Sequence, residues 1–439
     1  MAYQSHEWVQ SRPLGRATLD LVTLYRRCSS AFPYQRQIKD HGKVLTKPFE
    51  GVQNSGYDNA QGDLIVRIGD IITTSSPQPG QPNNKYLVEG MLGQGSFGQV
   101  LKCLELRSYA SFAVKVIKNL PAYARQAQFE RRILHMLREH NPQNIRHVVR
   151  LEEDFIYHEH FCFVTELLGE DLYTTLKQGK FRGFSLTLIS SIVQQILDAC
   201  CLMAELGIVH CDLKPENILI DRCLPKIKVI DLGSAVFEQK LLYTYIQSRY
   251  YRSPEVLVGA PYNTQIDMWS VGCIAAELFL GHPLFPGQSE YDQICRITKM
   301  LGQFPAHMVK NGINFKKNFV EERNIGLGYR LLTLQEYGKL TQNFKPPKQY
   351  QYIGNSVDET IEGYAAKLLK ENDRSGRGHS DRRPFIQFLH HVLQVDPKLR
   401  LTPKQAMQHP FITRQPFNPN WIPPSAMVRI TVKFLHHHL

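Results

Sequence analysis

One short stretch of the chain places a carboxylate, an ammonium group and an amide within six residues of one another. It reads IVHCDLKPEN over residues 208–217. Transfer of a phosphoryl group needs a carboxylate that receives or orients the hydroxyl proton, a cation near the moving phosphoryl group, and oxygen ligands for a metal ion. Asp212, Lys214 and Asn217 are of the types that supply these three groups. The stretch is therefore predicted to be a catalytic loop for phosphoryl transfer.

A second carboxylate, Asp231, follows nineteen residues after Asp212 in the sequence VIDLG. Together with Asn217 it could chelate the magnesium ion that bridges nucleotide phosphates, because carboxylate and amide oxygens suit this ion. A carboxylate at the end of a strand is often only a cap or a turn residue. Four such groups in this order and spacing argue against coincidence, so Asn217 and Asp231 are predicted to be the metal ligands.

A glycine-rich stretch, GQGSFGQV at residues 93–100, is of the type that lets backbone amides approach phosphates. A dinucleotide-binding turn would need a helix directly after the glycines, but residues 100–106 have the pattern of a second strand. A plain glycine hairpin is the alternative for this motif taken alone. The residues predicted to contact a nucleotide here are Gly93, Gly95, Ser96, Phe97, Gly98 and Val100.

Lys115 lies seventeen residues after Gly98, in the strand-like run FAVKVI. Because side chains alternate along a strand, Ala113 and Lys115 share one face, which suits adenine packing beside a cation. A lone lysine in a strand is usually a surface residue. Glu130, in a predicted helix fifteen residues later, offers an ion-pair partner that would hold the ammonium group on the α- and β-phosphates.

The elements that must position these residues change in type along the chain. Residues 86–117 and the runs that begin at Val148 and Phe161 are β-rich, and one helix is predicted at residues 126–140. After Asp171 the pattern becomes helical. The long predicted helices there are residues 185–206 and 263–281. A chain of 439 residues is long for one core, and the pattern predicts an α+β, bilobal fold with a small β-rich lobe and a larger, mainly helical lobe.

The predicted domain limits follow from these changes. Residues 1–60 look like an appendage with a short helix at 17–25, followed by a strand-like segment (63–72) and a turn-rich stretch. The predicted parts are an N-terminal extension (1–85), a first lobe (86–168), a second lobe (169–413) with a surface insert at about 310–384, and a tail (414–439).

The composition is that of an ordinary folded protein, with 43% apolar residues and a mean hydropathy of −0.30. The first twenty residues lack an apolar run, and the most apolar stretch, residues 268–280, is too short to span a bilayer. Nine cysteines are scattered without a CxxC pair, so neither a zinc site nor a disulfide framework is predicted. We expect free thiols in a reducing compartment, the cytoplasm or the nucleus, and no contact with a membrane.

The chain is basic, with a net charge of +12 and a pI of about 9.2. Such a charge can attract nucleic acid or anionic protein segments. The lysines and arginines are dispersed, however, and no nucleic-acid-binding module accompanies them. The charge is therefore interpreted as a solvated surface, and no nucleic-acid partner is expected.

Taken together, the motifs GxGxFGxV, AVK, HxDLKPEN, DLG, SPE and DMWSVGC resemble those of eukaryotic protein kinases over residues 86–413. Lys214, two residues after the predicted catalytic aspartate, resembles the serine/threonine class. The resemblance implies a kinase that uses ATP and Mg²⁺ and acts on protein substrates. It also implies a nucleotide pocket that includes Ala113, Lys115, Glu130, Thr165, Glu166, Leu168 and Leu219.

Three further features resemble the dual-specificity tyrosine-regulated kinases. They are Cys211 in place of the usual arginine, the loop YTYIQSRYYRSPE at 243–255, and a long insert before DPKLR at 396–400. Within this family, LTKPFEGVQNSGYDNAQGDLIV (45–66), LGQGSFGQV and HPFIT are most similar to the Yak subfamily. The resemblance extends from about residue 16 to about residue 424.

This narrower resemblance implies phosphorylation of Ser or Thr followed by proline, often with arginine upstream, and autophosphorylation of Tyr245. Cysteine at position 211 cannot grip a phosphothreonine as arginine does. Arg249 and Arg252 could instead hold a phosphotyrosine by charge-assisted bonds. Ordinary surface charge, or bonds to nearby backbone carbonyls, is the alternative for these two arginines.

The resemblance also assigns structural roles. Glu255 and Arg400 are expected to form a buried ion pair. Asp267 stands at the start of the helix predicted at residues 263–281, and from this place it is expected to cap backbone amides behind the catalytic loop. Thr165 stands where relatives usually have a bulky phenylalanine, which predicts a deeper pocket behind the adenine site.

A scaffold that keeps the fold without catalysis is the alternative to an active enzyme. Such proteins typically lose the lysine, the catalytic aspartate or the metal aspartate. Lys115, Glu130, Asp212, Asn217 and Asp231 are all present here. We therefore expect an active, monomeric serine/threonine kinase that phosphorylates its own Tyr245 and protein substrates with Ser/Thr-Pro sites.

Overall fold

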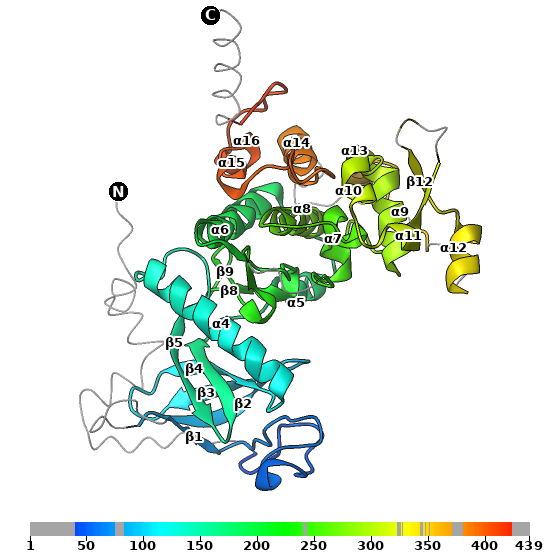
Figure 1. Ribbon diagram of the computed structural model, residues 1–439. Helices are drawn as coiled ribbons and strands as arrows, with labels where there is room; N and C mark the ends of the chain where they lie inside the picture. Colours follow the sequence, from blue (N-terminus) through cyan, green and yellow to red (C-terminus); the bar gives the residue numbers. More distant parts are fainter. Residues whose placement is uncertain are drawn as a thin grey trace, which may run out of the picture. The chain divides into compact units, whose positions relative to one another are not determined.

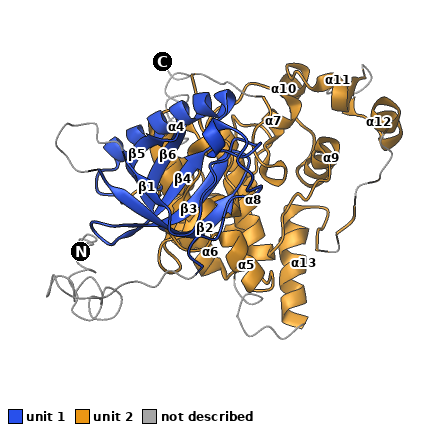
Figure 2. Cartoon of the chain, turned by 90° about the horizontal axis from the view of Figure 1, so that it is seen from below, with its two compact units in different colours: residues 1–145, 149–167 blue, residues 146–148, 168–439 orange. Residues whose placement is uncertain are grey.

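The computed structural model describes residues 40–74, 83–239, 244–322, 326, 328–342, 346, 348–350, 352–370 and 381–423. The chain divides into two compact units, which are residues 1–145 with 149–167 and residues 146–148 with 168–439 (Figure 2). The helix predicted at residues 17–25 and the C-terminal residues 427–439 lie outside the described residues.

The first unit contains a six-stranded antiparallel sheet with the strand order β1-β2-β3-β4-β6-β5, and helix α4 packs against it (Figure 1). Side chains alternate along the strands, so that in β4 Val114 and Val116 are buried while Ala113 and Lys115 are partly exposed. The bounds are β1 (Ile71–Thr73), β2 (Lys85–Gln94), β3 (Gly98–Glu105), β4 (Ser111–Ile117), α4 (Pro121–His140), β5 (Leu151–Tyr157) and β6 (His160–Glu166), with a short 3₁₀ turn, η1, at Asn54–Gly56.

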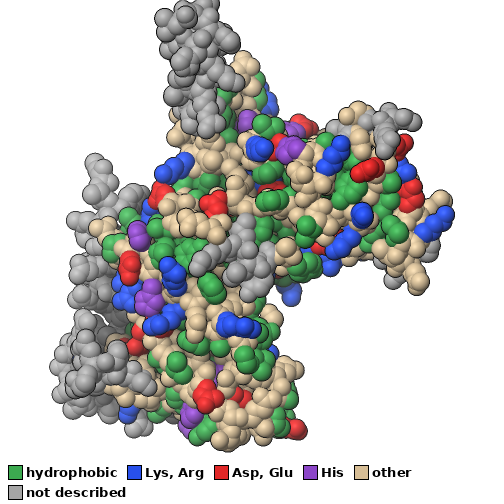
Figure 3. Space-filling view, viewed as in Figure 1, with side chains coloured by type: hydrophobic (Ala, Val, Ile, Leu, Met, Phe, Trp, Pro, Cys, Tyr) green, Lys and Arg blue, Asp and Glu red, His purple; other side chains and the backbone are tan. Residues whose placement is uncertain are grey.

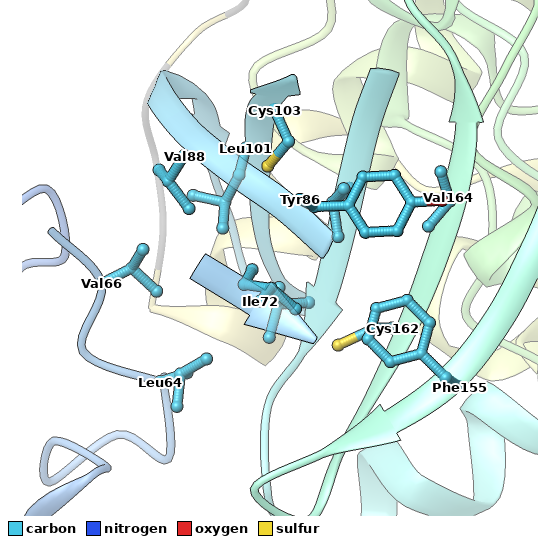
Figure 4. Close-up of a cluster of buried hydrophobic side chains, with 12 residues drawn as sticks. Leu64, Val66, Ile72, Tyr86, Val88, Leu101, Cys103, Phe155, Cys162 and Val164 are labelled. Atoms are coloured by element: carbon cyan, nitrogen blue, oxygen red, sulfur yellow. The ribbon is translucent and has the colours of Figure 1, made fainter. Parts of the chain in front are cut away.

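Residues 40–74, which the sequence pattern assigned to a separate extension, belong to the first unit. Their apolar side chains share its core, which consists of Leu64, Val66, Ile72, Tyr86, Val88, Leu101, Cys103, Val114, Val116, Phe155, Cys162 and Val164 (Figure 4). The strand predicted over residues 63–72 is limited to β1 at its end. A turn interrupts it, because the Asp70 carboxylate accepts a hydrogen bond from the Arg67 N–H and Gly69 has a φ of +96°.

Two long helices that contact each other form the centre of the second unit, α6 (Leu186–Glu205) and α8 (Gln265–Leu280). The side chain of Ser185 caps the start of α6 by accepting a backbone N–H. Nearly all residues of α8 are buried, as its apolar sequence predicted. Helix α8 ends at Gly281, whose φ is +75°; a Cβ there would collide with the carbonyl oxygen of Phe181, so only glycine fits.

Shorter elements complete the second unit. The predicted insert holds α11, the β11–β12 hairpin, α12 and α13, and Figure 1 shows α11, β12 and α12 at the periphery of this unit. The remaining bounds are α5 (Leu172–Gln178), β7 (Ile208–Val209), η2 (Pro215–Asn217), β8 (Ile218–Ile220), β9 (Ile227–Val229), η3 (Leu232–Ser234), β10 (Val236–Phe237), η4 (Arg249–Tyr251), α7 (Pro254–Val258), α9 (Glu290–Leu301), α10 (Ala306–Lys310), α11 (Phe315–Asn318), β11 (Phe319–Glu321), β12 (Tyr329–Leu331), α12 (Leu334–Thr341), α13 (Val357–Lys370), α14 (Arg383–Val392), α15 (Pro403–Ala406) and α16 (Pro410–Thr413).

Three features of the structure relate to the predicted absence of a membrane span, the predicted free thiols and the predicted dispersal of basic residues. Within the described residues one helix, α6, has the length and apolar composition of a membrane span, and 67% of that window is buried inside the protein, as in a core helix. The eight cysteines in this part of the chain are free thiols. On the face that Figure 3 shows, Lys and Arg side chains are scattered among other types.

Candidate active site

The predicted catalytic loop lies in the second unit, between β7 and β8. Its backbone is held from behind by Asp267 of α8, which is 4% exposed. The Asp267 carboxylate accepts the N–H of His210 at 2.8 Å and that of Cys211 at 3.1 Å. Burial raises the pKa of Asp267, while His210 and the two backbone amides counter that rise. The loop is therefore fixed to the central helix of the unit.

The three predicted catalytic residues lie together. Lys214 Nζ is 2.6 Å from Asp212 Oδ2, and Asn217 Nδ2 donates to the Asp212 carbonyl oxygen at 2.8 Å. The second carboxylate oxygen, Oδ1, accepts hydrogen bonds from the N–H (3.1 Å) and the hydroxyl (2.8 Å) of Ser248. Both oxygens of the Asp212 carboxylate are thus oriented by neighbouring groups.

Ser248 is a site residue that the sequence analysis missed. It lies thirty-six residues after Asp212, in the loop that carries Tyr245. Its Oγ is also 3.3 Å from Lys214 Nζ. In the sequence, Ser248 is marked only by its place within YIQSRYYRSPE, where the predicted roles were those of the tyrosine and the arginines.

The two predicted metal ligands are connected through the backbone. The N–H of Ile230, directly before Asp231, donates to the Asn217 carbonyl oxygen at 2.9 Å. Asp231 itself has a left-handed backbone, with φ 60° and ψ 76°, and caps η3. Such a conformation is unfavourable for a residue with a Cβ and is often found at functional sites.

The donor set fits a hard divalent cation. Because the side-chain nitrogen of Asn217 donates to the Asp212 backbone, its Oδ1 is the atom that can bind a metal ion. The Asp231 carboxylate supplies further oxygens, and magnesium prefers such oxygen ligands.

Cys211 is an apolar packing residue. Its side chain is fully buried in a small cluster with Val209, Val236, Ile246, Val256 and Ile266. Burial raises the pKa of its thiol well above the usual value. The thiol is therefore neutral at physiological pH and takes no part in proton transfer.

The nucleotide-binding residues predicted in the β-rich region lie on the sheet of the first unit. Lys115 Nζ is 2.6 Å from Glu130 Oε1, and the Glu130 side chain is only 5% exposed. Lys115 on β4 lies opposite Val100 on β3, and Ala113 lies opposite Thr165 on β6. Since residues opposite each other in antiparallel strands share a face, these side chains form one patch with the cation at its end.

The glycine-rich stretch forms the turn between β2 and β3. The Gly95 N–H donates to the Gly98 carbonyl oxygen at 2.8 Å. At Gly98, where φ is +151°, a Cβ would collide with the Val116 carbonyl oxygen, so glycine is required. A Cβ at Gly93 or Gly95 would meet nothing within 4 Å. The remaining predicted residues of this stretch are Ser96, which is exposed at the tip, and Phe97, which packs edge-on against Tyr123 of α4.

The other predicted adenine-pocket residues are divided between the units. The Glu166 carboxylate of the first unit accepts the Arg150 N–H at 3.0 Å, so this side chain is tied to the backbone. Leu168 and Leu219 belong to the second unit. They lie in neighbouring segments there, because the Gly169 N–H donates to the carbonyl oxygen of the residue after Leu219, at 2.8 Å.

The loop with the predicted phosphorylation site exposes its tyrosine. Tyr245 is 70% exposed, and the Arg252 guanidinium lies 4.2 Å from the centre of its ring. Arg252 also donates to the carbonyl oxygens of Ile246 and Gln247, both at 2.8 Å, and pairs with Glu290. In the unmodified chain Arg252 therefore binds backbone carbonyls, one of the alternatives left open above, and also contacts the tyrosine ring.

Arg249 differs from Arg252 in its surroundings. Its Nη1 donates to the carbonyl oxygen of Gln288 at 2.7 Å, and its side chain is exposed.

Glu255 and Arg400, for which a buried pair was expected, form two hydrogen bonds of 2.7 and 3.0 Å, and both residues are at most 2% exposed.

A pocket of about 550 Å³ lies beside the catalytic loop, entirely within the second unit. Lys214 and Ser248 line it, together with two carboxylates, Glu216 and Glu277. Burial raises the pKa of Glu216, and burial together with the charge of Glu216 raises the pKa of Glu277 to about 7. The Tyr251 hydroxyl donates to Glu277 at 2.6 Å. Because burial is the main cause of both rises, a cation in this pocket would favour the ionised forms of the two carboxylates.

Comparison with known proteins agrees with this chemistry. Residues 86–412 match the protein kinase domain, which confirms the predicted α+β kinase fold. The chain is 42% identical over 425 residues to the dual specificity protein kinase YAK1 of Saccharomyces cerevisiae, covering 94% of this chain and 52% of that protein. It is 41% identical to the serine/threonine-protein kinase ppk15 of Schizosaccharomyces pombe, over 92% of this chain and 75% of the relative.

A third similar protein is a probable dual specificity protein kinase YAK1 homolog of Encephalitozoon cuniculi. The identity is 39%, and the match covers 84% of this chain and 82% of the relative. The chain spans only about half the length of the Saccharomyces relative.

Proposed function

Because the chain belongs to the protein kinase family and, within it, to the dual-specificity Yak1 kinases, we propose that it transfers the γ-phosphoryl group of ATP to serine and threonine side chains of proteins. The observation that carries the proposal is the geometry around Asp212, whose carboxylate is held by Lys214 on one oxygen and by Ser248 on the other. A scaffold without catalysis would have no need of this arrangement.

In the proposed reaction the substrate hydroxyl oxygen forms a bond to the γ-phosphorus, and the bond from that phosphorus to the β-phosphate oxygen breaks. The Asp212 carboxylate receives the hydroxyl proton. Lys214, whose Nζ is 2.6 Å from that carboxylate, can donate to phosphoryl oxygens as negative charge moves onto them. Ser248 keeps the carboxylate from rotating.

We propose Mg²⁺ as the metal and Asn217 and Asp231 as the residues that hold it. When bound, this ion neutralises charge on the phosphates. The support is the donor set, in which an amide oxygen and a carboxylate come from segments joined by the hydrogen bond from Ile230 to Asn217. Lys115, held by Glu130, is proposed to bind the α- and β-phosphates.

For the substrate we propose a Ser or Thr followed by proline, with arginine upstream. The preference for proline rests on the resemblance of residues 243–255 to proline-directed relatives. The arginine is supported by the pocket of Glu216 and Glu277, because a guanidinium group would relieve the repulsion between the two carboxylates.

We also propose that the kinase phosphorylates its own Tyr245. The tyrosine is 70% exposed and therefore accessible, and Arg252 lies over its ring, where it is available to a phosphate group. The names of two relatives include dual specificity. The free thiols are compatible with the cytoplasm or the nucleus, which we propose as the location.

The proposed function is tested with protein made in bacteria, where other eukaryotic kinases are absent. Transfer of phosphate from ATP to a basic Ser-Pro peptide is measured for the wild type and for Asp212→Asn, and phosphotyrosine is mapped by mass spectrometry. We expect transfer and modified Tyr245 with the wild type alone. Folded wild-type protein that modifies neither the peptide nor Tyr245 would favour a scaffold.

A further inference from the structure

Two glutamines flank the glycine-rich turn, and both bind residues outside the matched kinase domain. Gln94 ends β2 and Gln99 lies near the start of β3, and the two are opposite each other in the strand register. The side chain of each glutamine reaches residues 44–66, a stretch that we call the N-terminal segment. The domain match begins only at residue 86.

Gln94 binds the N-terminal segment with both ends of its amide group. Its Nε2 donates to the Lys47 carbonyl oxygen at 2.7 Å, and its Oε1 accepts the Lys47 N–H at 3.2 Å. The same Nε2 is 3.2 Å from the carboxylate of Asp63. Paired bonds to the N–H and the carbonyl oxygen of one residue resemble those between neighbouring antiparallel strands and fix the direction of the side chain.

Gln99 makes the matching contact from the other side of the turn, and it is buried at 1% exposure. Its Nε2 donates to the Leu64 carbonyl oxygen at 2.6 Å, and its Oε1 is 3.0 Å from the hydroxyl of Thr46. That hydroxyl also accepts the Val66 N–H at 3.0 Å. Both ends of the glycine-rich turn are thus bonded to the same segment.

The N-terminal segment is itself fixed to the sheet. Leu64 and Val66 insert into the core of the first unit, with exposures of 3% and 2% (Figure 4). Asp58 is bonded to the ring of His160 on β6 at 2.8 Å, and Asp63 pairs with Lys118 at 3.3 Å. The N-terminal segment is therefore fixed to the sheet, and its bonds to Gln94 and Gln99 restrict movement of the glycine-rich turn.

The tip of the turn between the two glutamines, Gly95 and Ser96, has few side-chain contacts of its own. Gly95 has no atom within 4 Å of the position of a Cβ, and Ser96 is exposed. Glycines have high backbone conformational entropy at such an unrestrained tip, and part of this entropy is lost when the backbone amides close on phosphates. Holding both ends of the turn reduces this loss, which favours binding.

We propose that the N-terminal segment holds the glycine-rich turn in its phosphate-binding shape through Gln94 and Gln99, so that residues outside the kinase domain set the affinity for ATP. Gln94 acts as a positioning residue, since it binds the segment and not the nucleotide. The inference rests on the proposed function, because it requires that the turn binds the phosphates of ATP.

The test measures binding of Mg-ATP and of adenosine to the full chain by titration calorimetry. Gln94→Ala is the main variant, since Gln94 is exposed and its loss leaves the core intact. We expect its Kd for Mg-ATP to rise about 5- to 10-fold, as for the loss of a few exposed hydrogen bonds, with the Kd for adenosine unchanged. Adenosine lacks the phosphates that the turn would bind, so it reports on the adenine pocket alone.

Two further variants complete the experiment. Thr46→Val keeps the shape of the side chain, removes its hydroxyl, and is expected to raise the Kd for Mg-ATP in the same selective way. Gln61→Ala is the matched control, an exposed glutamine of the same segment whose side chain bonds to no described residue, and it should bind both ligands like the wild type.

The outcomes separate this inference from the proposed function. Unchanged affinity for Mg-ATP in folded Gln94→Ala and Thr46→Val, or equal weakening of ATP and adenosine, would overturn the inference alone. A wild-type protein that binds neither ligand would overturn the proposed function and the inference together.

Discussion

Glu216 and Glu277 line one pocket beside the catalytic loop, and the negative charge of Glu216 adds to burial in raising the pKa of Glu277 to about 7. At pH 6 Glu277 is therefore mostly protonated, and at pH 8 it is mostly ionised. Arginine stays charged throughout this range. The attraction of the pocket for an arginine side chain should consequently increase as the pH rises through about 7.

This pH dependence can be measured with two peptides that differ only in arginine or norleucine upstream of the phosphorylated serine. We expect the ratio of their kcat/KM values to rise from pH 6 to pH 8 in favour of arginine. The ratio cancels the pH dependence of the catalytic step. Glu277→Gln, which can still accept the Tyr251 hydrogen bond, should make the ratio independent of pH. A flat ratio in the wild type would contradict the role of Glu277.

Ser248→Ala should lower kcat without changing ATP binding, because Ser248 contacts the Asp212 carboxylate. Loss of this orienting bond is expected to reduce kcat about 10-fold, less than the roughly 10²–10⁴-fold loss for Asp212→Asn. Steady-state kinetics and the Kd for ATP check both values. A Ser248→Ala enzyme with wild-type kcat would show that Lys214 alone suffices to orient Asp212.

Arg252→Ala should lower stability more than Arg249→Ala does. Arg252 is 2% exposed and bonds two carbonyl oxygens and Glu290, whereas Arg249 is exposed and makes one such bond. Removing the buried group leaves carbonyls unpaired, at a cost of about 1–3 kcal/mol. Denaturant unfolding of both variants in the Asp212→Asn background, where Tyr245 should be unmodified, isolates this effect. Equal losses would mean that the backbone bonds of Arg252 contribute little.

Thr165→Phe should weaken inhibitors with bulky groups behind the adenine site. Thr165 lies opposite Ala113 in the register and is only partly exposed, so a phenyl ring would fill the adjacent space. We expect inhibition constants for such compounds to rise at least about 10-fold, the cost of roughly 1.4 kcal/mol. The KM for ATP should change little, and Thr165→Ala serves as the control that keeps the space open. Equal inhibition of Thr165→Phe and wild type would refute the deeper pocket.

Arg400→Ala should damage folding before chemistry, because it leaves Glu255 charged and buried. Breaking such a pair from one side typically costs about 3–5 kcal/mol. Glu255→Gln with Arg400→Met removes both charges and should recover part of that loss. Urea unfolding gives the free energies, and a single variant as stable as the wild type would contradict the expectation.

Local motifs were enough to predict the groups of the active site that lie close in sequence. Asp212, Lys214 and Asn217 fall within six residues, and Glu130 is one strand-to-helix connection away from Lys115. The role expected for Asp267 rested on its place at the start of the buried helix, and its two bonds to His210 and Cys211 join segments more than fifty residues apart. Contacts of this kind join distant segments, so no periodicity or spacing in the sequence reports them.

The same reason explains what the sequence did not reveal. Ser248 reaches Asp212 across thirty-six residues, and Thr46 reaches Gln99 across fifty-three. The N-terminal residues were assigned to an extension because the β-rich pattern of the first lobe begins at residue 86. Their apolar side chains at Leu64 and Val66 had the pattern of a strand, but the turn at Gly69 and the packing of these residues into another sheet were not visible.

The packing of Leu64 and Val66 has a practical meaning for how this protein can be divided. The region that matches a kinase domain begins at residue 86, yet a fragment cut there would lose three side chains that fill the core of its first unit, those of Leu64, Val66 and Ile72. The exposed apolar surface would promote aggregation. The start of the region that matches the family is therefore not the start of an autonomous folding unit. Residues 40–74 and the region from residue 86 onward must be expressed and engineered together.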